Sequence, residues 1–434
     1  MKRLSWILML LVCLLTAHAQ RTDKKDYVSV ALQPNHADWN YKLNEKVSLT
    51  LCVMKHYCPL ENVEVECEWG PELGTPDWKE TKRLKDGKTT LVLPGAKIPG
   101  FRTLKATVKV EGRKYSNYIN LAFAPEKIQP TTQMPADFHL FWQQAINEVR
   151  TLPFEPLLTL QPELCTPQAD VYHVRFQNTR KGQYIYGMLA IPKGEGPFPA
   201  VLKVPGAGVR PYMGETNFFP QAGVITLEIG IHGIPVNMDQ PMYDNLRNNA
   251  LADYNTSHID DRDRYYYKRV YLGCVRAVDF LCSLPQVDST RLAVYGGSQG
   301  GALAIVTAAL HDKIDCLSAN YPALCEIAGF YHGRVGGWPK IFKDKNEVAL
   351  KEKVGVSEYF DVVNFARCLR VPGFYLWGYN DQVCCPTSVY SAYNVITAPK
   401  QSYLFLDAAH WMYPEHREMQ ALWLIDHLKN SGRA

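Results

Sequence analysis

The chain has 434 residues, of which 47% are hydrophobic, 12% aromatic and 21% charged, and its formal net charge is +4. This composition is typical of a folded globular protein with two or three domains, and it argues against long disordered regions. The small net charge and the lack of a basic stripe argue against a nucleic-acid partner.

Residues 1–19 have the pattern of a secretory signal peptide. Two positive residues precede the apolar run Leu4–Thr16, which is too short to span a bilayer, and an Ala-His-Ala cleavage site ends the segment. We therefore expect an exported protein, periplasmic or secreted, that has no membrane association once the signal is removed. The odd number of cysteines left after cleavage predicts at least one free thiol, and none of them has zinc-ligand spacing with a histidine.

Residues 20–124 alternate apolar and polar side chains. The runs Val47–Val53, Val63–Trp69 and Leu104–Val110 show the alternation most clearly, and turn residues separate them. Period-two alternation indicates antiparallel strands with one buried face. Six or seven such strands predict an immunoglobulin-like β-sandwich domain. We find no catalytic constellation in this segment and expect a structural or packing role for it.

Residues 125–135 carry prolines and polar residues and are typical of a linker. From 136 to 434, strand-length apolar runs alternate with helical segments, which predicts a doubly wound α/β sheet. A helical excursion near 323–365 interrupts this alternation and is expected to lie over the carboxyl ends of the strands. The expected strands are 171–176, 184–191, 200–204, 224–229, 291–296, 314–320, 374–377 and 403–406, and the expected helices 138–149, 267–284, 387–396 and 414–429.

A Gly-x-Ser-x-Gly motif lies between one of these strands and a helix. Ser298 occupies its centre, with Gly296 and Gly300 two positions to either side. A nucleophile elbow needs small residues at these positions, because a side chain would collide with the neighbouring backbone. The motif therefore predicts a nucleophilic serine in an α/β-hydrolase fold.

A serine nucleophile needs a base, and the base needs a residue that orients it. In α/β-hydrolases the chain order is Ser, then Asp or Glu, then His, each after a strand. Asp381 and His410 each follow an apolar run through a short turn, so we predict a Ser298–His410–Asp381 triad. Asp407 and His416 are the competing candidates. We prefer Asp381 because adjacent strand ends usually supply the acid and the base separately, and His410 because His416 falls within the final helix.

Two backbone N–H groups are candidates for the oxyanion hole. The first belongs to Gln299, which starts the helix after the serine, and the second to Ala207, in the Gly-rich loop after the expected strand 200–204. The reaction needs no metal or organic cofactor.

The hydrolase segment resembles the acetyl xylan esterase/cephalosporin C deacetylase family from about Pro135 to the C-terminus. The residues that carry the resemblance are Tyr265–Val270, Val275–Val278, Pro285–Asp288, Gly296–Gly301, Asp381 with Cys384 and Pro386, and Tyr393-Asn394 followed by Pro399-Lys400. The resemblance implies the same triad and the same oxyanion donors, although the family usually has a tyrosine where Ala207 stands. It also implies removal of acetyl groups from short xylo-oligosaccharides and cephalosporins. Family members often form hexamers, which makes a homo-oligomer possible here.

The sequence departs from the family at two places near the site. His232-Gly233-Ile234 stands where the family usually has Arg-Gly-Gln, and Trp411 stands where a glutamate usually follows the catalytic histidine. These changes indicate that a supporting ion pair is replaced by a less charged arrangement, which leaves substrate specificity and assembly open.

We therefore expect an exported serine esterase that removes acetyl groups from sugars derived from plant polysaccharides. Two alternatives stay open. One is an exopeptidase of the prolyl oligopeptidase type, although the N-terminal segment is too short for the propeller of such enzymes. The other is a non-catalytic carbohydrate-binding protein that retains the fold.

Overall fold

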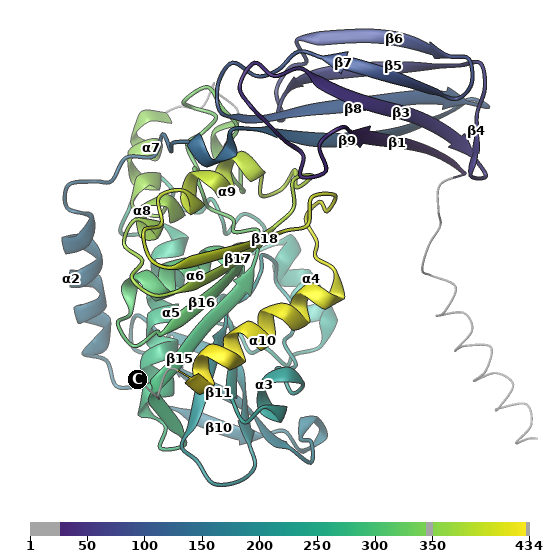
Figure 1. The fold of residues 1–434 in the computed structure, drawn as a ribbon. Coiled ribbons are helices and arrows are strands. Elements are labelled where there is room, and N and C mark those ends of the chain that lie inside the picture. Colours follow the sequence, from purple (N-terminus) through teal and green to yellow (C-terminus); the bar gives the residue numbers. More distant parts are fainter. Residues whose placement is uncertain (1–26, 344–349, 431–434) are drawn as a thin grey trace, which may run out of the picture.

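The computed structural model describes residues 27–343 and 350–430 (Figure 1). The expected signal peptide lies outside the described residues. Within the described part of the chain, no helix combines the length and the apolar character needed to cross a membrane.

The N-terminal part of the described chain forms a β-sandwich. Its strands are β1 (Val28–Pro34), β2 (Asn40–Tyr41), β3 (Val47–Lys55), β4 (Cys58–Pro59), β5 (Val63–Pro71), β6 (Trp78–Leu84), β7 (Lys88–Leu93), β8 (Gly100–Val110) and β9 (Arg113–Phe123). One sheet has the order β1-β3-β4 with β7 paired to β3, and the other has the order β2-β9-β8-β5-β6. The inward-facing residues, among them Leu51, Trp69 and Leu104, are fully buried. The sandwich is confirmed. It has more strands than the six or seven expected, because β2 and β4 are only two residues long and too short to show an alternating pattern in the sequence.

The second part of the chain is built on one nine-stranded sheet. Its strands are β10 (Leu157–Leu160), β11 (Ala169–Gln177), β12 (Tyr184–Pro192), β13 (Phe198–Lys203), β14 (Ile225–Gly230), β15 (Val287–Gly297), β16 (Cys316–Asn320), β17 (Gly373–Trp377) and β18 (Lys400–Leu404). Their order is β10-β11-β12-β14-β13-β15-β16-β17-β18, and the six strands from β14 to β18 in this order are parallel. Strands β14 and β15 lie on opposite sides of β13, so the strand order reverses its direction at β13. Such a topological switch point is where ligands bind in open α/β sheets.

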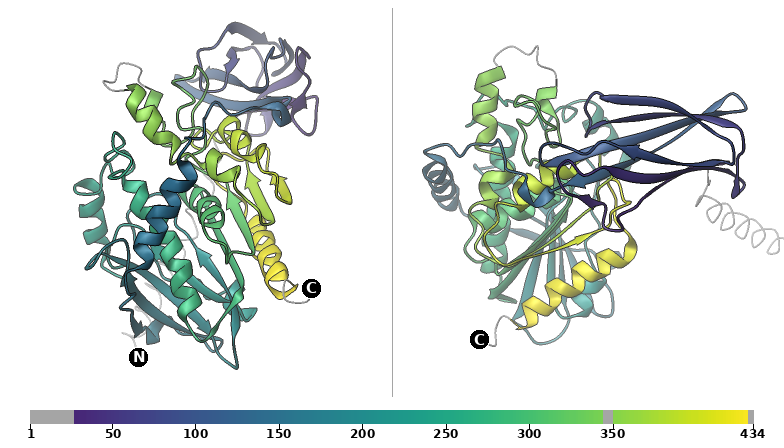
Figure 2. Two further views of the ribbon diagram at one scale, coloured as in Figure 1. Left: turned by 90° about the vertical axis from the view of Figure 1, so that its left-hand side faces the viewer. Right: turned by 45° about the horizontal axis from the view of Figure 1, so that its top comes forward.

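Helices cover both faces of this sheet (Figure 2). They are α2 (Phe138–Arg150), α3 (Phe218–Gln221), α4 (Gln240–Asn248), α5 (Tyr266–Ser283), α6 (Gln299–Leu310), α7 (Leu350–Glu358), α8 (Val362–Ala366), α9 (Pro386–Tyr393) and α10 (Pro414–Asn430), with 3-10 turns at Pro125–Lys127, Pro162–Leu164 and Ile341–Lys343. Buried residues of α2, α5, α6, α8 and α9 share the largest core cluster with one face, whereas α3 and α10 pack on the other. The α/β-hydrolase fold class is thereby confirmed.

Some elements differ from the sequence expectation. Strand β10 and helix α4 were not expected, because β10 is exposed throughout and α4 buries only Tyr243. Strand β18 spans Lys400–Leu404, whereas the sequence predicted a strand at 403–406. It lies at the edge of the sheet and begins with the polar residues Lys400–Ser402, so the apolar run that starts at Tyr403 marks only the end of the strand.

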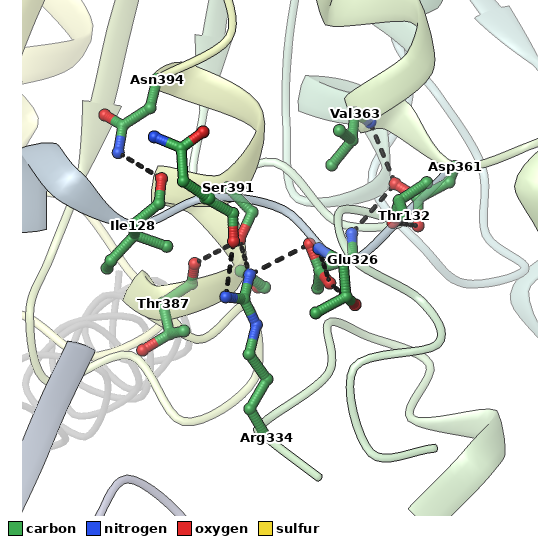
Figure 3. Close-up of polar contacts among 12 residues, drawn as sticks. Ile128, Thr132, Glu326, Arg334, Asp361, Val363, Thr387, Ser391 and Asn394 are labelled. Carbon is green, nitrogen blue, oxygen red and sulfur yellow. Dashed lines mark hydrogen bonds and ion pairs between the residues drawn. The ribbon is translucent and has the colours of Figure 1, made fainter. Parts of the chain in front are cut away.

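The linker is fixed against the hydrolase part by specific hydrogen bonds (Figure 3). The side chain of Asn394, which directly follows α9, donates to the carbonyl of Ile128 at 2.9 Å, and the Thr132 hydroxyl donates to Asp361 at 2.9 Å. Asp361 in turn accepts the backbone N–H groups of Glu326 and the following residue, at 3.0 and 2.7 Å. The linker is therefore tied to both α9 and the excursion, although the domain boundaries at 124 and 135 stay predictions.

The eleven cysteines in the described residues are free thiols. Cys52 and Cys58, which could have bridged in an exported protein, lie on the paired strands β3 and β4 without a disulfide.

Candidate active site

Ser298 lies on a sharp turn between β15 and α6, at φ 60° and ψ −124°. The turn requires small neighbours, because a Cβ on Gly296 would lie 2.6 Å from the carbonyl oxygen of Val204. The backbone N–H of Ser298 donates to the carbonyl of Asn320 at 3.0 Å, which pins the turn to the end of β16. The serine hydroxyl makes no capping bond to α6 and is therefore available to another partner.

That partner is His410, which comes from the loop after β18. Its Nε2 lies 2.9 Å from the Ser298 hydroxyl, and its Nδ1 lies 2.7 Å from a carboxylate oxygen of Asp381. A carboxylate only accepts hydrogen bonds, so Nδ1 carries the proton and Nε2 accepts from the serine. The ring of Tyr321 packs edge-on against His410 at 4.8 Å and restrains its orientation. No local pattern in the sequence marks Tyr321 as part of the site.

Asp381 is completely buried, and its second carboxylate oxygen is also bonded. This oxygen accepts the backbone N–H groups of Val383 and Cys384 at 2.7 and 2.9 Å. These two hydrogen bonds fix the plane of the carboxylate, so that its other oxygen faces His410. The structure thus brings together the three residues predicted from the sequence.

The competing residues have other partners. Asp407 accepts a hydrogen bond from the Tyr413 hydroxyl at 2.5 Å, and His416, in α10, stacks on Phe405 with ring centroids 5.1 Å apart. Neither takes part in the hydrogen-bond chain from Ser298.

The loop after β13, which carries Ala207, is held by three side chains. Gln299 donates to the carbonyl of Pro205 at 3.3 Å, Arg210 donates to the carbonyl of Ala207, and His232 donates to the carbonyl of Gly208 at 3.2 Å. Ala207 and Ser298 line the same cavity of about 910 Å³. Donors fixed in place before the reaction are what an oxyanion hole requires.

Gln299 itself is fixed by two tyrosines. Its side chain is fully buried, and its oxygen accepts hydrogen bonds from the hydroxyls of Tyr254 and Tyr267, each at 2.8 Å. Tyr267 lies within one of the stretches that carry the family resemblance, but only the fold brings it beside the Ser298 turn.

One group of metal-ligating side chains occurs in the part of the chain that the structure describes. Ligand atoms of Asp381, Cys384 and His410 lie within 4.8 Å of one another. Two of the three are already bonded to each other, and burial raises the pKa of the Cys384 thiol well above its ordinary value, which disfavours the thiolate that a metal requires. The arrangement therefore fits acid–base chemistry better than a metal centre.

Comparison with known proteins matches most of the chain to a family. The family model described as acetyl xylan esterase matches residues 125–427. The chain belongs to the acetyl xylan esterase family. An acetyl esterase of Xylanibacter ruminicola, Axe7A, is 38% identical over 414 residues, which cover 94% of this chain and 92% of that protein. The resemblance seen in the sequence is confirmed, and family membership makes the chain a serine esterase.

Two solved structures of acetyl xylan esterases share the fold. The enzyme from Paenibacillus sp. R4 is 29% identical with a TM-score of 0.61, and the match covers 69% of this chain and 97% of that one. Acetyl xylan esterase 1 from Thermoanaerobacterium sp. JW/SL YS485 is 23% identical with a TM-score of 0.61, covering 70% and 97%. The matched family region begins at residue 125, so the sandwich lies outside it.

The two departures from the acetyl xylan esterase pattern have different surroundings. Trp411 is 44% exposed and packs edge-on against Tyr413 at 4.7 Å. His232 is buried, and because its Nε2 donates to Gly208, its Nδ1 accepts from the Tyr266 hydroxyl at 2.7 Å. A neutral histidine here thus supports the Ala207 loop where the family usually has an arginine.

His232 makes stability depend on pH in a defined window. Burial, with smaller contributions from the positive charges of Arg269 and Arg210, lowers the pKa of His232 from 6.5 to about 4. Between these values the unfolded chain binds a proton that the folded protein does not, so stability falls as the pH drops from about 6.5 to 4. Over this window the free energy of unfolding should fall for both proteins. We expect the fall in His232→Gln to be smaller than in the wild type by on the order of 3 kcal/mol. Urea unfolding at several pH values measures the difference.

The matched control is His139→Gln, because His139 is exposed on α2. It should follow the wild-type curve. A His232→Gln curve parallel to the wild type would contradict the neutral buried state of His232.

Proposed function

We propose that the protein is an exported acetyl esterase that acts on acetylated sugars of plant polysaccharides, with Ser298, His410 and Asp381 as its catalytic triad. The observation that carries the proposal is the continuous hydrogen-bond chain from the Ser298 hydroxyl through His410 to Asp381, at 2.9 and 2.7 Å. A buried carboxylate, an oriented imidazole and a serine on a strained turn are the components that acyl transfer needs.

The first half-reaction forms an acyl-enzyme. The Ser298 oxygen attacks the carbonyl carbon of the acetyl group while His410 Nε2 takes the serine proton. The backbone N–H groups of Gln299 and Ala207 donate to the oxyanion of the tetrahedral intermediate. When the intermediate collapses, the bond to the sugar oxygen breaks and His410 gives its proton to that oxygen, which leaves as a hydroxyl. Asp381 stays ionised and stabilises the imidazolium that forms transiently.

The second half-reaction releases acetate. Water attacks the acetyl-serine carbonyl, and His410 takes one proton from the water. Collapse breaks the bond to the Ser298 oxygen, which recovers its proton from His410. The sum is hydrolysis of one ester by one water, and no metal or organic cofactor takes part in either step.

The cavity suits a sugar ester rather than a purely apolar one. Its wall carries an ion pair between Lys203 and Glu228 at 3.0 Å, together with Asn217 and Gln420. Such groups offer both donors and acceptors to sugar hydroxyls. The Xylanibacter relative, named as an acetyl esterase, supports acetyl as the acyl group. Export, a homo-oligomeric state and the absence of nucleic-acid and membrane partners stay predictions.

Acetate release from a substrate panel tests the proposal. We expect release from acetylated xylo-oligosaccharides and p-nitrophenyl acetate, and no hydrolysis of aminoacyl-proline anilides, because the cavity wall carries charged and amide groups for sugar hydroxyls and the family is one of esterases. Acetylated pectin and monosaccharides define how narrow the preference is. Peptidase activity without acetate release would overturn the proposal in favour of the exopeptidase alternative.

A further inference from the structure

Strand β9 of the sandwich contacts the loop that carries Asp381. The Asn120 side chain donates to the carbonyl of Tyr379 at 2.8 Å, and the Asn120 backbone N–H donates to the Asn380 side-chain oxygen at 2.8 Å. The Tyr118 hydroxyl donates to the carbonyl of Asn380 at 2.8 Å. The two residues that immediately precede Asp381 are therefore bonded to a part of the chain outside the family match.

The contacting face of the sandwich is preformed. Asn120 is fully buried, and the Thr103 hydroxyl on β8 donates to its side-chain oxygen at 2.6 Å, which directs its NH₂ group toward Tyr379. Phe101, also on β8, packs edge-on against the Tyr379 ring at 4.9 Å. Removing Tyr379 from this face would leave a buried amide without an acceptor, which is costly.

Asn380 extends the contact to the loop that carries His410. Its NH₂ group donates to the carbonyl of Asp407 at 3.2 Å, and its backbone N–H donates to the carbonyl of Ala408 at 3.1 Å. The two loops are pressed together, since a Cβ on Gly378 would collide with the Ala408 backbone. One side chain thus links the sandwich, the Asp381 loop and the His410 loop.

Glu72 of the sandwich reaches the other end of the same loop. It is buried and accepts the backbone N–H of Thr387, at the start of α9, at 3.4 Å. Burial, with a smaller contribution from the negative charge of Asp381, raises the pKa of Glu72 to about 8. At pH 7 the carboxyl group is therefore mostly neutral and does not place a second negative charge beside Asp381.

We propose that the N-terminal sandwich takes part in the esterase reaction by holding the Asp381 loop, with Asn120 and Tyr118 as positioning residues for Asp381. The inference rests on the proposed triad and adds to it. The sandwich acts through the carboxylate: by fixing Tyr379 and Asn380, it sets where Asp381 stands relative to His410.

The first experiment compares single variants of the full-length chain. We expect Asn120→Ala to lower kcat on p-nitrophenyl acetate on the order of tenfold with KM within about twofold, because misplacing a catalytic group costs turnover rather than binding. Tyr118→Phe, which removes one hydroxyl and is the more conservative change, should give a smaller loss of kcat in the same direction. Tyr115→Phe is the matched control, since Tyr115 lies on the opposite face of β9, and it should keep the wild-type kcat.

The second experiment is a double-mutant cycle, which separates positioning from stability. If Asn120 acts through Asp381, then Asn120→Ala should cause no further loss of kcat in an Asp381→Asn background. An equal loss in both backgrounds would overturn the inference. So would a lowered melting temperature with unchanged kcat for both Asn120→Ala and Tyr118→Phe, because a merely structural contact predicts that pattern.

The two proposals fail separately. Activity that survives Ser298→Ala would overturn the proposed function itself. Activity that is lost in Ser298→Ala but unchanged in Asn120→Ala and Tyr118→Phe would leave the triad in place and overturn only the role of the sandwich.

Discussion

Ser298→Ala is expected to abolish both acetyl-ester hydrolysis and covalent labelling by a fluorophosphonate probe. The substitution removes the attacking oxygen, and kcat should fall by about 10⁴-fold or more, leaving only what the oxyanion donors and binding supply. The serine hydroxyl bonds to His410 and does not cap α6, so the variant should keep its fold. Two measurements on the same preparation check the result: mass spectrometry detects the labelling, and an assay of acetate release gives the activity.

Two comparisons make this test specific. Ser116→Ala, which removes an exposed serine of the sandwich, should leave labelling and hydrolysis at wild-type levels. The melting temperature of Ser298→Ala should stay close to that of the wild type. A folded Ser298→Ala variant that is still labelled would show that another nucleophile reacts, and the proposed mechanism would then be wrong.

The three residues of this proposal could be predicted because each leaves a local pattern. Ser298 lies between glycines at the end of a buried strand, and Asp381 and His410 each follow a strand in the chain order that the hydrolase fold requires. The sequence could also rank Asp381 above Asp407 from its position after its own strand. The hydrogen bond from His410 to Asp381 agrees with that ranking.

The residues that support these three leave no such pattern. Asn120 lies 259 positions before Tyr379, and nothing in a single sequence indicates that β9 will meet the Asp381 loop. The role of His232 was equally hidden, since its protonation state depends on burial beside Gly208 and Tyr266. Local patterns predict strands and motifs, whereas contacts between distant elements depend on how whole sheets pack.

Asp381→Asn is the second variant for which a large loss is expected, and the structure gives the reason. One oxygen of Asp381 accepts the backbone N–H groups of Val383 and Cys384, so an asparagine must keep its carbonyl oxygen at that place. Its NH₂ group then faces Nδ1 of His410, which forces Nδ1 to accept and moves the ring proton to Nε2. A protonated Nε2 cannot take the proton of Ser298, and kcat should fall by about 10⁴-fold.

Asp407→Asn is the matched control for this prediction, because it makes the same chemical change three residues before His410. The Asp407 carboxylate accepts from Tyr413 and makes no hydrogen bond to His410, so the change should lower kcat by less than about tenfold. Steady-state kinetics on p-nitrophenyl acetate, with melting temperatures for both variants, compare the two aspartates directly. If Asp407→Asn lost the larger share of kcat while Asp381→Asn stayed active, the assignment of the orienting carboxylate would be reversed. The double-mutant cycle with Asn120 would then need Asp407 in place of Asp381.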